Sequence, residues 1–236
     1  MIDAARTPIG KYRGSLSSFT AVELGTLVTK ELLDKTKLKK DKIDQVIFGN
    51  VLQAGNGQNV ARQIALNSGI PVDVPAMTIN EVCGSGMKAV ILARQLIQLG
   101  EAELVVAGGT ESMSQAPMLK PYQSETNEYG EPISSMVNDG LTDAFSNAHM
   151  GLTAENVATQ FSVSREEQDR YALASQLKAA QAVEAGMFSE EIIPLKISAE
   201  DMLSEDEAVR GNSTLEKLGT LRTCLLYTSP SPRDST

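Results

Sequence analysis

Residues 80–87 read Asn-Glu-Val-Cys-Gly-Ser-Gly-Met, and they place Cys83 between an expected strand and an expected helix. The strand is expected over 76–80 and the helix over 87–99, where apolar residues dominate. Open α/β folds bind ligands at the carboxyl ends of their strands, and a helix N-terminus favours a thiolate over a thiol. The two glycines after the cysteine allow a substrate to approach the backbone closely. The stretch therefore favours a cysteine nucleophile that attacks acyl carbonyls and carries a thioester.

The residues alone leave alternatives open for each candidate. An inert, buried cysteine is the competing interpretation of Cys83, because most free cysteines pack in cores. His149 is the only histidine, which makes it a candidate base for Cys83, yet a lone histidine is more often a hydrogen-bonded structural residue. Met150 and three further methionines between residues 113 and 150 either line an apolar ligand slot or fill gaps in packing.

The segments around this stretch alternate between strand and helix patterns. Helices are expected over 20–32, 59–68 and 87–99, and apolar strands over 46–52, 76–80 and 104–107. This alternation predicts an α/β fold with a mostly parallel sheet covered by helices. Further helices are expected over 153–160 and 164–185, and a short strand over 192–197. Capping boxes mark two of the helix starts, Thr20 with Glu23 and Ser164 with Glu167.

Two segments depart from this alternation. Residues 112–150 are rich in Ser, Pro, Gly, Asn and Met with little periodicity, which predicts a long irregular insertion of the kind that usually carries function. Residues 224–236 read CLLYTSPSPRDST and continue no earlier pattern.

Composition excludes several classes of protein. The 236 residues carry a formal charge of −9, which argues against a nucleic-acid partner. One histidine and two cysteines cannot form a zinc site of the usual kind, and two cysteines make no disulfide framework. No apolar run approaches the roughly 18 residues of a membrane span, and no basic-apolar leader opens the chain. We therefore expect a cytoplasmic protein without a membrane partner or a metal.

Several motifs follow one another in an order that resembles one known family. They match the N-terminal part of thiolases, in the biosynthetic, short-chain acetyl-CoA acetyltransferase group, over about residues 1–223. Several such matches in order are more specific than any single one. The matching stretches are Ala5–Gly10, Gly57–Gln63, Asn80–Gly86, Gly108–Ser114, His149–Asn156 and Ser164–Asp169.

The resemblance implies a role for each matched residue. Cys83 is expected to be the nucleophile that carries the acetyl group, with its backbone N–H in an oxyanion hole. Leu141, His149, Met150 and Arg222 are expected to contact coenzyme A. In this family the matched histidine lies along the pantetheine arm, so the resemblance argues against His149 as the base for Cys83.

The implied reaction is the reversible Claisen condensation of two acetyl-CoA to acetoacetyl-CoA and free CoA. No permanently bound cofactor and no metal is expected, and coenzyme A enters only as part of the substrates. Residues 57–63 look like the family's subunit-contact segment, which implies a homodimer or homotetramer in the full-length enzyme.

The implied architecture is a thiolase fold, with a layered α/β/α N-terminal half, a long loop-domain insertion, and no C-terminal half. We expect an N-terminal thiolase domain over 1–115 and a loop domain that returns toward it over 116–223. Residues 224–236 are expected to be an artefactual, non-family tail.

The chain departs from the family in the segments that it lacks. The Gly-His-Pro, Cys-x-Gly and Asn-x-x-Gly-Gly segments are absent, and Cys224 is followed by Leu225 and Leu226 rather than by a Cys-x-Gly pattern. We therefore expect an incomplete fragment that is inactive alone. The alternative is a catalytically dead CoA-binding or interaction module. Decarboxylating ketosynthases share the nucleophilic cysteine but not stretches 109–113 and 149–151 together.

Overall fold

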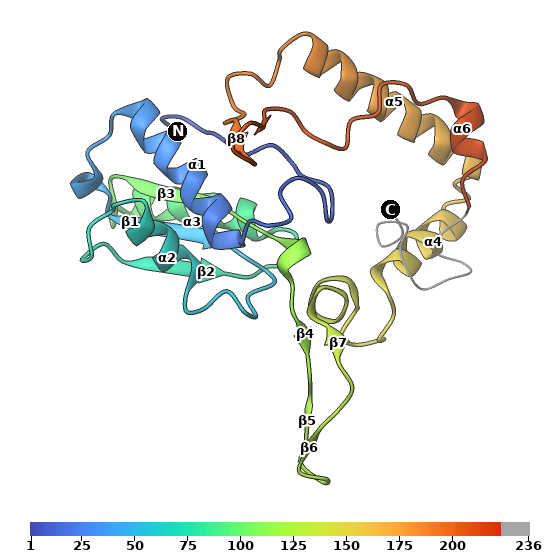
Figure 1. The fold of residues 1–236 in the computed structure, drawn as a ribbon, viewed down its shortest axis with the longest axis horizontal. Helices are drawn as coiled ribbons and strands as arrows, with labels where there is room; N and C mark the ends of the chain where they lie inside the picture. The colour runs from blue at the N-terminus through green and yellow to red at the C-terminus, as the bar shows by residue number, and fades with distance from the viewer. Residues whose placement is uncertain (223–236) are drawn as a thin grey trace. The chain divides into compact units, whose positions relative to one another are not determined.

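The computed structural model describes residues 1–222, and these form two compact units (Figure 1). The first unit contains Met1–Thr7 and Leu16–Gly140, and the second contains Pro8–Ser15 and the described residues from Leu141 to Arg222. The sequence-based division into 1–115 and 116–223 stays a prediction. The segment 224–236 lies outside the described residues.

Three parallel strands form the sheet of the first unit, as the sequence predicts. They are β1 (Gln45–Gly49), β2 (Ala76–Ile79) and β3 (Val105–Gly109), in the order β2-β1-β3. Val46 of the central strand is paired with Ala76 on one side and with Val106 on the other. The three carboxyl ends therefore meet at one edge of the sheet, where α/β folds place ligands.

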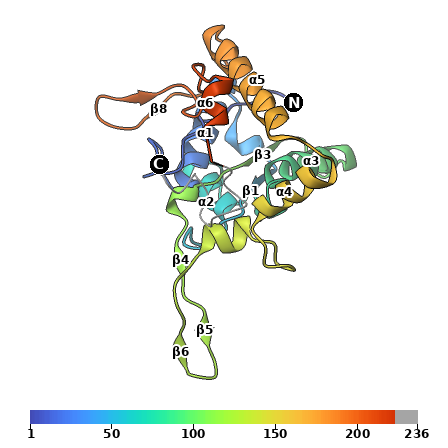
Figure 2. The same cartoon turned by 90° about the vertical axis from the view of Figure 1, so that its right-hand side faces the viewer.

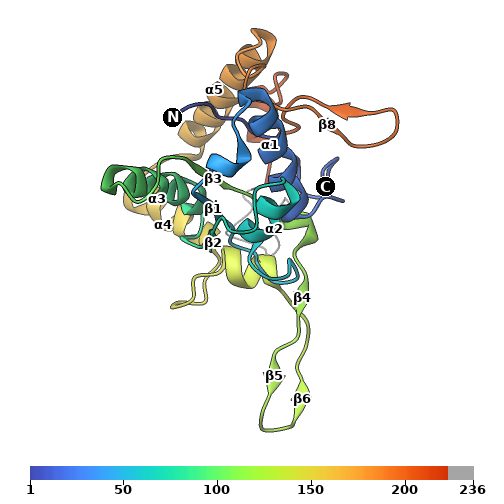
Figure 3. The same cartoon turned by 90° about the vertical axis from the view of Figure 1, so that its left-hand side faces the viewer.

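Helices cover both faces of this sheet (Figure 3). The helices α1 (Ala21–Thr36) and α2 (Val60–Asn67) lie on one face, and α3 (Ser85–Leu99) lies on the other. A short 3₁₀ helix, η1 (Lys40–Lys42), precedes β1. The capping box expected at the start of α1 is present. The apolar core lies between the sheet, α1 and α2, and it comprises Val22, Leu33, Ile43, Val46, Phe48, Val60, Ala61, Ile64, Ala65, Ile70 and Val74.

The helix α3 is covered on one face only. Ala89 and Ala93 are buried, whereas Met87, Val90 and Leu99 are exposed. The helix begins two residues earlier than the apolar pattern predicts, because its first two residues, Ser85 and Gly86, carry no apolar signal.

The segment after β3 is more ordered than the sequence suggests. It contains η2 (Met113–Gln115), β4 (Met118–Leu119), β5 (Tyr122–Gln123), β6 (Glu128–Tyr129), β7 (Ile133–Ser134) and the π-helix η3 (Met136–Leu141). The pairs β4–β7 and β5–β6 are antiparallel and form an arm that extends away from the sheet (Figures 1 and 2). The short strands of this insertion were not predicted, because two-residue strands are too short to produce a readable alternation.

The described part of the second unit contains three helices and a small hairpin. The helices are α4 (Met150–Gln160), α5 (Arg165–Glu184) and α6 (Leu215–Gly219), and the hairpin pairs β8 (Leu195–Lys196) with β9 (Met202–Leu203). The helices α5 and α6 pack against each other (Figure 2). The capping box expected at the start of α5 is present. Within residues 1–222, no helix is both long and apolar enough to cross a membrane.

Candidate active site

Cys83 lies in the turn that joins β2 to α3, as the sequence predicts. Its thiol is free and its side chain is exposed, so the interpretation of Cys83 as a buried core residue is wrong. Because α3 begins at Ser85, the partial positive charge of the helix N-terminus lies beside the cysteine. The role of Cys83 as a nucleophile stays a prediction.

The hydroxyl of Ser85 ties this turn together. Its Oγ accepts a hydrogen bond from the Glu81 N–H at 2.8 Å and donates one to the Val82 carbonyl at 2.6 Å. Ser85 itself is only 4% exposed, so its hydroxyl is shielded from bulk water. The Asn80 side-chain oxygen accepts a third bond, from the Val82 N–H at 2.9 Å. These bonds fix the backbone immediately before Cys83.

Val82 adopts a left-handed backbone conformation, with φ at 50°. For a β-branched residue this conformation is an outlier that costs on the order of 1–3 kcal/mol. The hydrogen bonds of the turn hold Val82 in place against that cost. The resulting sharp turn gives the exposed Cys83 its position between a strand end and a helix start, and backbone strain of this kind is common at functional sites.

Close glycine contacts let the start of α3 lie directly on the strand ends. A Cβ on Gly49 would come within 2.5 Å of the Ser85 carbonyl carbon and 2.6 Å of the Gly86 nitrogen. A Cβ on Gly109 would lie 3.0 Å from the Gly86 Cα. The glycines at the ends of β1 and β3 are therefore required for the approach of α3, which in turn places Cys83 at the carboxyl edge of the sheet.

A carboxylate network joins the ends of β1 and β3 at the same edge. The Glu111 carboxylate accepts hydrogen bonds from the Asn50 side-chain amide at 2.9 Å and from the N–H groups of Val51 and Leu52 at 2.9 and 3.1 Å. Burial raises the pKa of Glu111 and outweighs these three bonds, which lower it. Sequence reasoning assigned no role to Asn50 or Glu111, because they are 61 positions apart and only the fold brings them together.

In the second unit, His149 begins α4 as its N-cap. Its Nδ1 accepts a hydrogen bond from the Gly151 N–H at 3.0 Å. A ring nitrogen that accepts carries no proton, so a neutral His149 carries its proton on Nε2. The helix starts three residues before the predicted residue 153, because a histidine ring replaces the Ser, Thr or Asp that usually signals an N-cap.

A tight loop brings Leu141, His149 and Met150 together. Thr142 and His149 form an antiparallel bridge, which leaves Leu141 and Met150 at the two ends of the loop. Inside it, the Asp143 N–H donates to the Ala148 carbonyl at 2.9 Å. Three of the four residues predicted to contact coenzyme A therefore lie on one loop.

Arg222, the fourth such residue, is exposed in the second unit and follows the helix α6. Cys83 belongs to the first unit. Arg165 lies in Ser164–Asp169, one of the stretches that resemble thiolases, but the sequence assigns it no role of its own. Arg165 binds the carbonyls of Leu218, within α6, and of Leu221, after it, and backbone acceptors carry no sequence signal.

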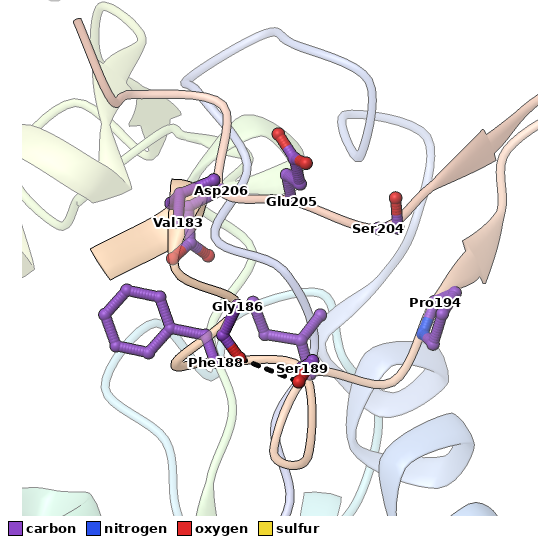
Figure 4. A pocket seen from close by; sticks show the side chains of 9 residues that line it. Val183, Gly186, Phe188, Ser189, Pro194, Ser204, Glu205 and Asp206 are labelled. Carbon is purple, nitrogen blue, oxygen red and sulfur yellow. Dashed lines mark hydrogen bonds between the residues drawn. The ribbon is translucent and has the colours of Figure 1, made fainter. Parts of the chain in front are cut away.

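One cavity of about 250 Å³ lies in the second unit (Figure 4). Apolar side chains and two carboxylates line it together, and the lining includes Val183, Phe188, Pro194, Glu205 and Asp206. None of the predicted site residues lines this cavity. Among residues 1–222, no three His, Cys, Asp or Glu side chains are grouped as a metal site.

Comparison with known families matches residues 1–226 to the thiolase N-terminal domain. The chain belongs to the thiolase family. An acetyl-CoA acetyltransferase of Allochromatium vinosum is 50% identical over 228 residues, and one of Pseudomonas aeruginosa is 46% identical over 228 residues. The crystal structure of the Acat5 thiolase from Ascaris suum in complex with coenzyme A matches with a TM-score of 0.87 at 40% identity. These comparisons confirm the thiolase family and its α/β fold as predicted from the sequence.

The chain spans 58% of the length of each of the two acetyltransferases and of the Ascaris thiolase. The same matches cover 94–95% of this chain. The thiolase resemblance therefore extends over nearly all of the chain but over less than two thirds of these relatives.

Proposed function

We propose that this chain supplies Cys83, the acetyl carrier, to an acetyl-CoA C-acetyltransferase, and that alone it accepts an acetyl group but does not complete the condensation. The observation that carries the proposal is an exposed, free cysteine in a strained turn at the N-terminus of α3. Support comes from the thiolase relatives named acetyl-CoA acetyltransferases and from the relative solved with coenzyme A. The substrates are acetyl-CoA and acetoacetyl-CoA, and the working assembly is a homodimer or homotetramer.

In the first step, the Cys83 sulfur forms a bond to the carbonyl carbon of acetyl-CoA. The carbonyl electrons move onto oxygen, where the Cys83 N–H donates a hydrogen bond to the negative charge. Collapse of this intermediate breaks the bond to the CoA sulfur, and CoA leaves with the proton that the Cys83 thiol lost. The amides of Gly84 and Ser85 close the turn, because they donate to the carbonyls of Glu81 and Val82 at 3.1 Å each.

In the second step, the α-carbon of another acetyl-CoA attacks acetyl-Cys83. A carbon–carbon bond forms and the bond between the acetyl carbon and sulfur breaks. The α-proton ends on the Cys83 sulfur, which restores the thiol, and acetoacetyl-CoA leaves. The thioester itself makes the α-proton acidic, so the step requires no metal and no resident cofactor.

Coenzyme A is held by Leu141, His149, Met150 and Arg222. The Nδ1 of His149 is already an acceptor within α4, and this supports a binding role because the ring can donate to a ligand only through Nε2. A guanidinium such as that of Arg222 suits the phosphates of coenzyme A.

An exchange experiment tests the proposal. The chain is incubated with acetyl-CoA and isotope-labelled free CoA, because label enters acetyl-CoA only if Cys83 accepts and returns the acetyl group. We expect exchange in the wild-type chain and none in Cys83→Ser. Binding of CoA without exchange in either chain would favour a CoA-binding module instead.

A further inference from the structure

The helix α6 has only five residues, Leu215–Gly219, which is too short to be stable without tertiary contacts. Its N-terminus is capped by Thr214, whose side-chain oxygen accepts from the Lys217 N–H at 3.2 Å. Its C-terminus leads within three residues to Arg222. The direction in which Arg222 leaves this helix therefore depends on what holds the last carbonyls.

Arg165 holds these carbonyls from the first position of α5. Its Nη2 donates to the Leu218 carbonyl at 2.7 Å and to the Leu221 carbonyl at 3.0 Å. The Leu221 carbonyl belongs to the peptide bond that joins Leu221 to Arg222. A guanidinium group at this point also suits the negative end of the α6 dipole.

Asp169 fixes the orientation of Arg165. Both Asp169 carboxylate oxygens accept from the Arg165 Nε, at 2.9 and 3.0 Å, across one turn of α5. The Asp169 side chain is 17% exposed, so the pair is shielded from solvent more than an ordinary surface ion pair. The Arg165 charge is thereby matched by Asp169, whereas Arg222 is an exposed cation directly after the segment that Arg165 holds.

We propose that Arg165 is a positioning residue that holds the Leu218–Leu221 carbonyls and thereby aims Arg222 at an anionic phosphate of coenzyme A. The proposal rests on the proposed function, because it takes coenzyme A as the ligand. It adds a role for Arg165 and Asp169, which touch no substrate and act through the backbone before Arg222.

Binding of two ligands to the full chain tests this proposal by calorimetry. Coenzyme A carries phosphates, whereas pantetheine lacks them and retains the neutral arm. We expect Arg165→Gln and Arg222→Gln each to weaken coenzyme A binding about tenfold and to leave pantetheine binding unchanged. The double variant should be no weaker than Arg222→Gln, since the two residues act as one unit.

Arg170→Gln is the matched control. Arg170 lies on the same helix and pairs with Glu166 at the same spacing, but this pair is exposed, and within residues 1–222 no hydrogen bond joins it to α6. It should leave both ligands unaffected. Unchanged coenzyme A binding in Arg165→Gln, or an equal loss of pantetheine, would overturn the proposal, because a general structural role moves both ligands.

Hydrogen exchange of residues 218–222 separates this inference from the proposed function. If the wild-type chain binds no coenzyme A, the proposed function fails, and the claim about Arg165 is then judged by exchange alone. Faster exchange in Arg165→Gln than in Arg170→Gln, confined to these amides, supports the positioning role. Equal exchange in both variants refutes it.

Discussion

Gly49 and Ser85 approach so closely that a Cβ on Gly49 would lie 2.5 Å from the Ser85 carbonyl carbon. This contact joins the end of the central strand β1 to the start of α3, immediately after Cys83. The opposing atoms are backbone, which cannot rotate away as a side chain can. The position of the candidate nucleophile therefore depends on the absence of a side chain at residue 49.

The variant Gly49→Ala should displace the start of α3 and destabilise the first unit. Overpacking of this kind costs about 1–3 kcal/mol, which urea denaturation can measure. The same variant should slow acetylation of Cys83. Gly219→Ala is the control, because a Cβ there meets nothing within 4 Å. Equal stability of both variants would show that the contact at Gly49 relaxes without cost.

Ser85→Ala should leave the Glu81 N–H without its side-chain partner, whereas the Val82 carbonyl keeps the Ser85 backbone N–H. Loss of these hydroxyl hydrogen bonds costs about 0.5–1.5 kcal/mol in unfolding free energy. Acetylation of Cys83 should also slow, because the strained Val82 loses a restraint. Ser68→Ala is the matched control, since the Ser68 hydroxyl is buried and has no hydrogen-bond partner within residues 1–222. It should change stability by less than about 0.5 kcal/mol, and a loss equal to that of Ser85→Ala would contradict the assigned role.

The hydrogen bonds between the Glu207 carboxylate and the loop of residues 8–15 should make the free energy of unfolding depend on pH. Burial alone would raise the pKa of Glu207, but hydrogen bonds from the Ser15 hydroxyl and from the N–H groups of Lys11 and Ser15 outweigh it, so the pKa is lowered. A lowered carboxyl pKa stabilises the fold above the unfolded value of about 4.3, and this contribution is lost as the pH falls through the folded value.

The variant Glu207→Gln should therefore be less stable than wild type at pH 7, and the difference should shrink below about pH 4.3. Denaturant titrations at several pH values measure it. Glu205→Gln, at an exposed neighbour, should track wild type throughout. If the difference in unfolding free energy between wild type and Glu207→Gln stays constant down to low pH, the ionised carboxylate does not hold residues 8–15.

The tautomer of His149 can be read directly. It is the only histidine of the chain, so ¹⁵N labelling gives one set of imidazole signals. At a pH where the ring is neutral, we expect the proton on Nε2, because Nδ1 accepts from the Gly151 N–H. A proton on Nδ1 would contradict the assigned cap.

Two variants of His149 distinguish its helix-capping hydrogen bond from the proposed binding of coenzyme A by its ring. His149→Asn keeps a side-chain acceptor for the cap, whereas His149→Ala loses both functions. Coenzyme A binding should weaken in both variants. Exchange of the Gly151 amide should accelerate only in the alanine variant.

The sequence predicts best where the physical cause is local. The capping boxes at Thr20 and Ser164 satisfy backbone groups within three residues, and both helices begin where these residues indicate. The strands β1 and β3 carry enough apolar residues to be recognised. The turn between β2 and α3 is recognised by its glycines instead. Cys83 could be singled out because strand, turn and helix signals meet at that residue.

Interactions across long sequence separations could not be predicted in the same way. Asn50 and Glu111 meet only after β1 and β3 pair, and neither residue signals the other. Arg165 binds backbone carbonyls 53 and 56 positions away, which any residue type would supply. The left-handed Val82 opposes its own backbone preference, because hydrogen bonds of the turn rather than residue propensity hold it.

The most direct test of the account is the chemical state of Cys83 after incubation of the chain with acetyl-CoA. Rapid acid quenching, proteolysis and mass spectrometry would locate any acetyl group. We predict one acetyl group as a thioester on Cys83. Added CoA should release it as acetyl-CoA, and it should be absent in Cys83→Ala. An unmodified Cys83 under conditions where acetyl-CoA is bound, or an acetyl group that persists in Cys83→Ala, would contradict it.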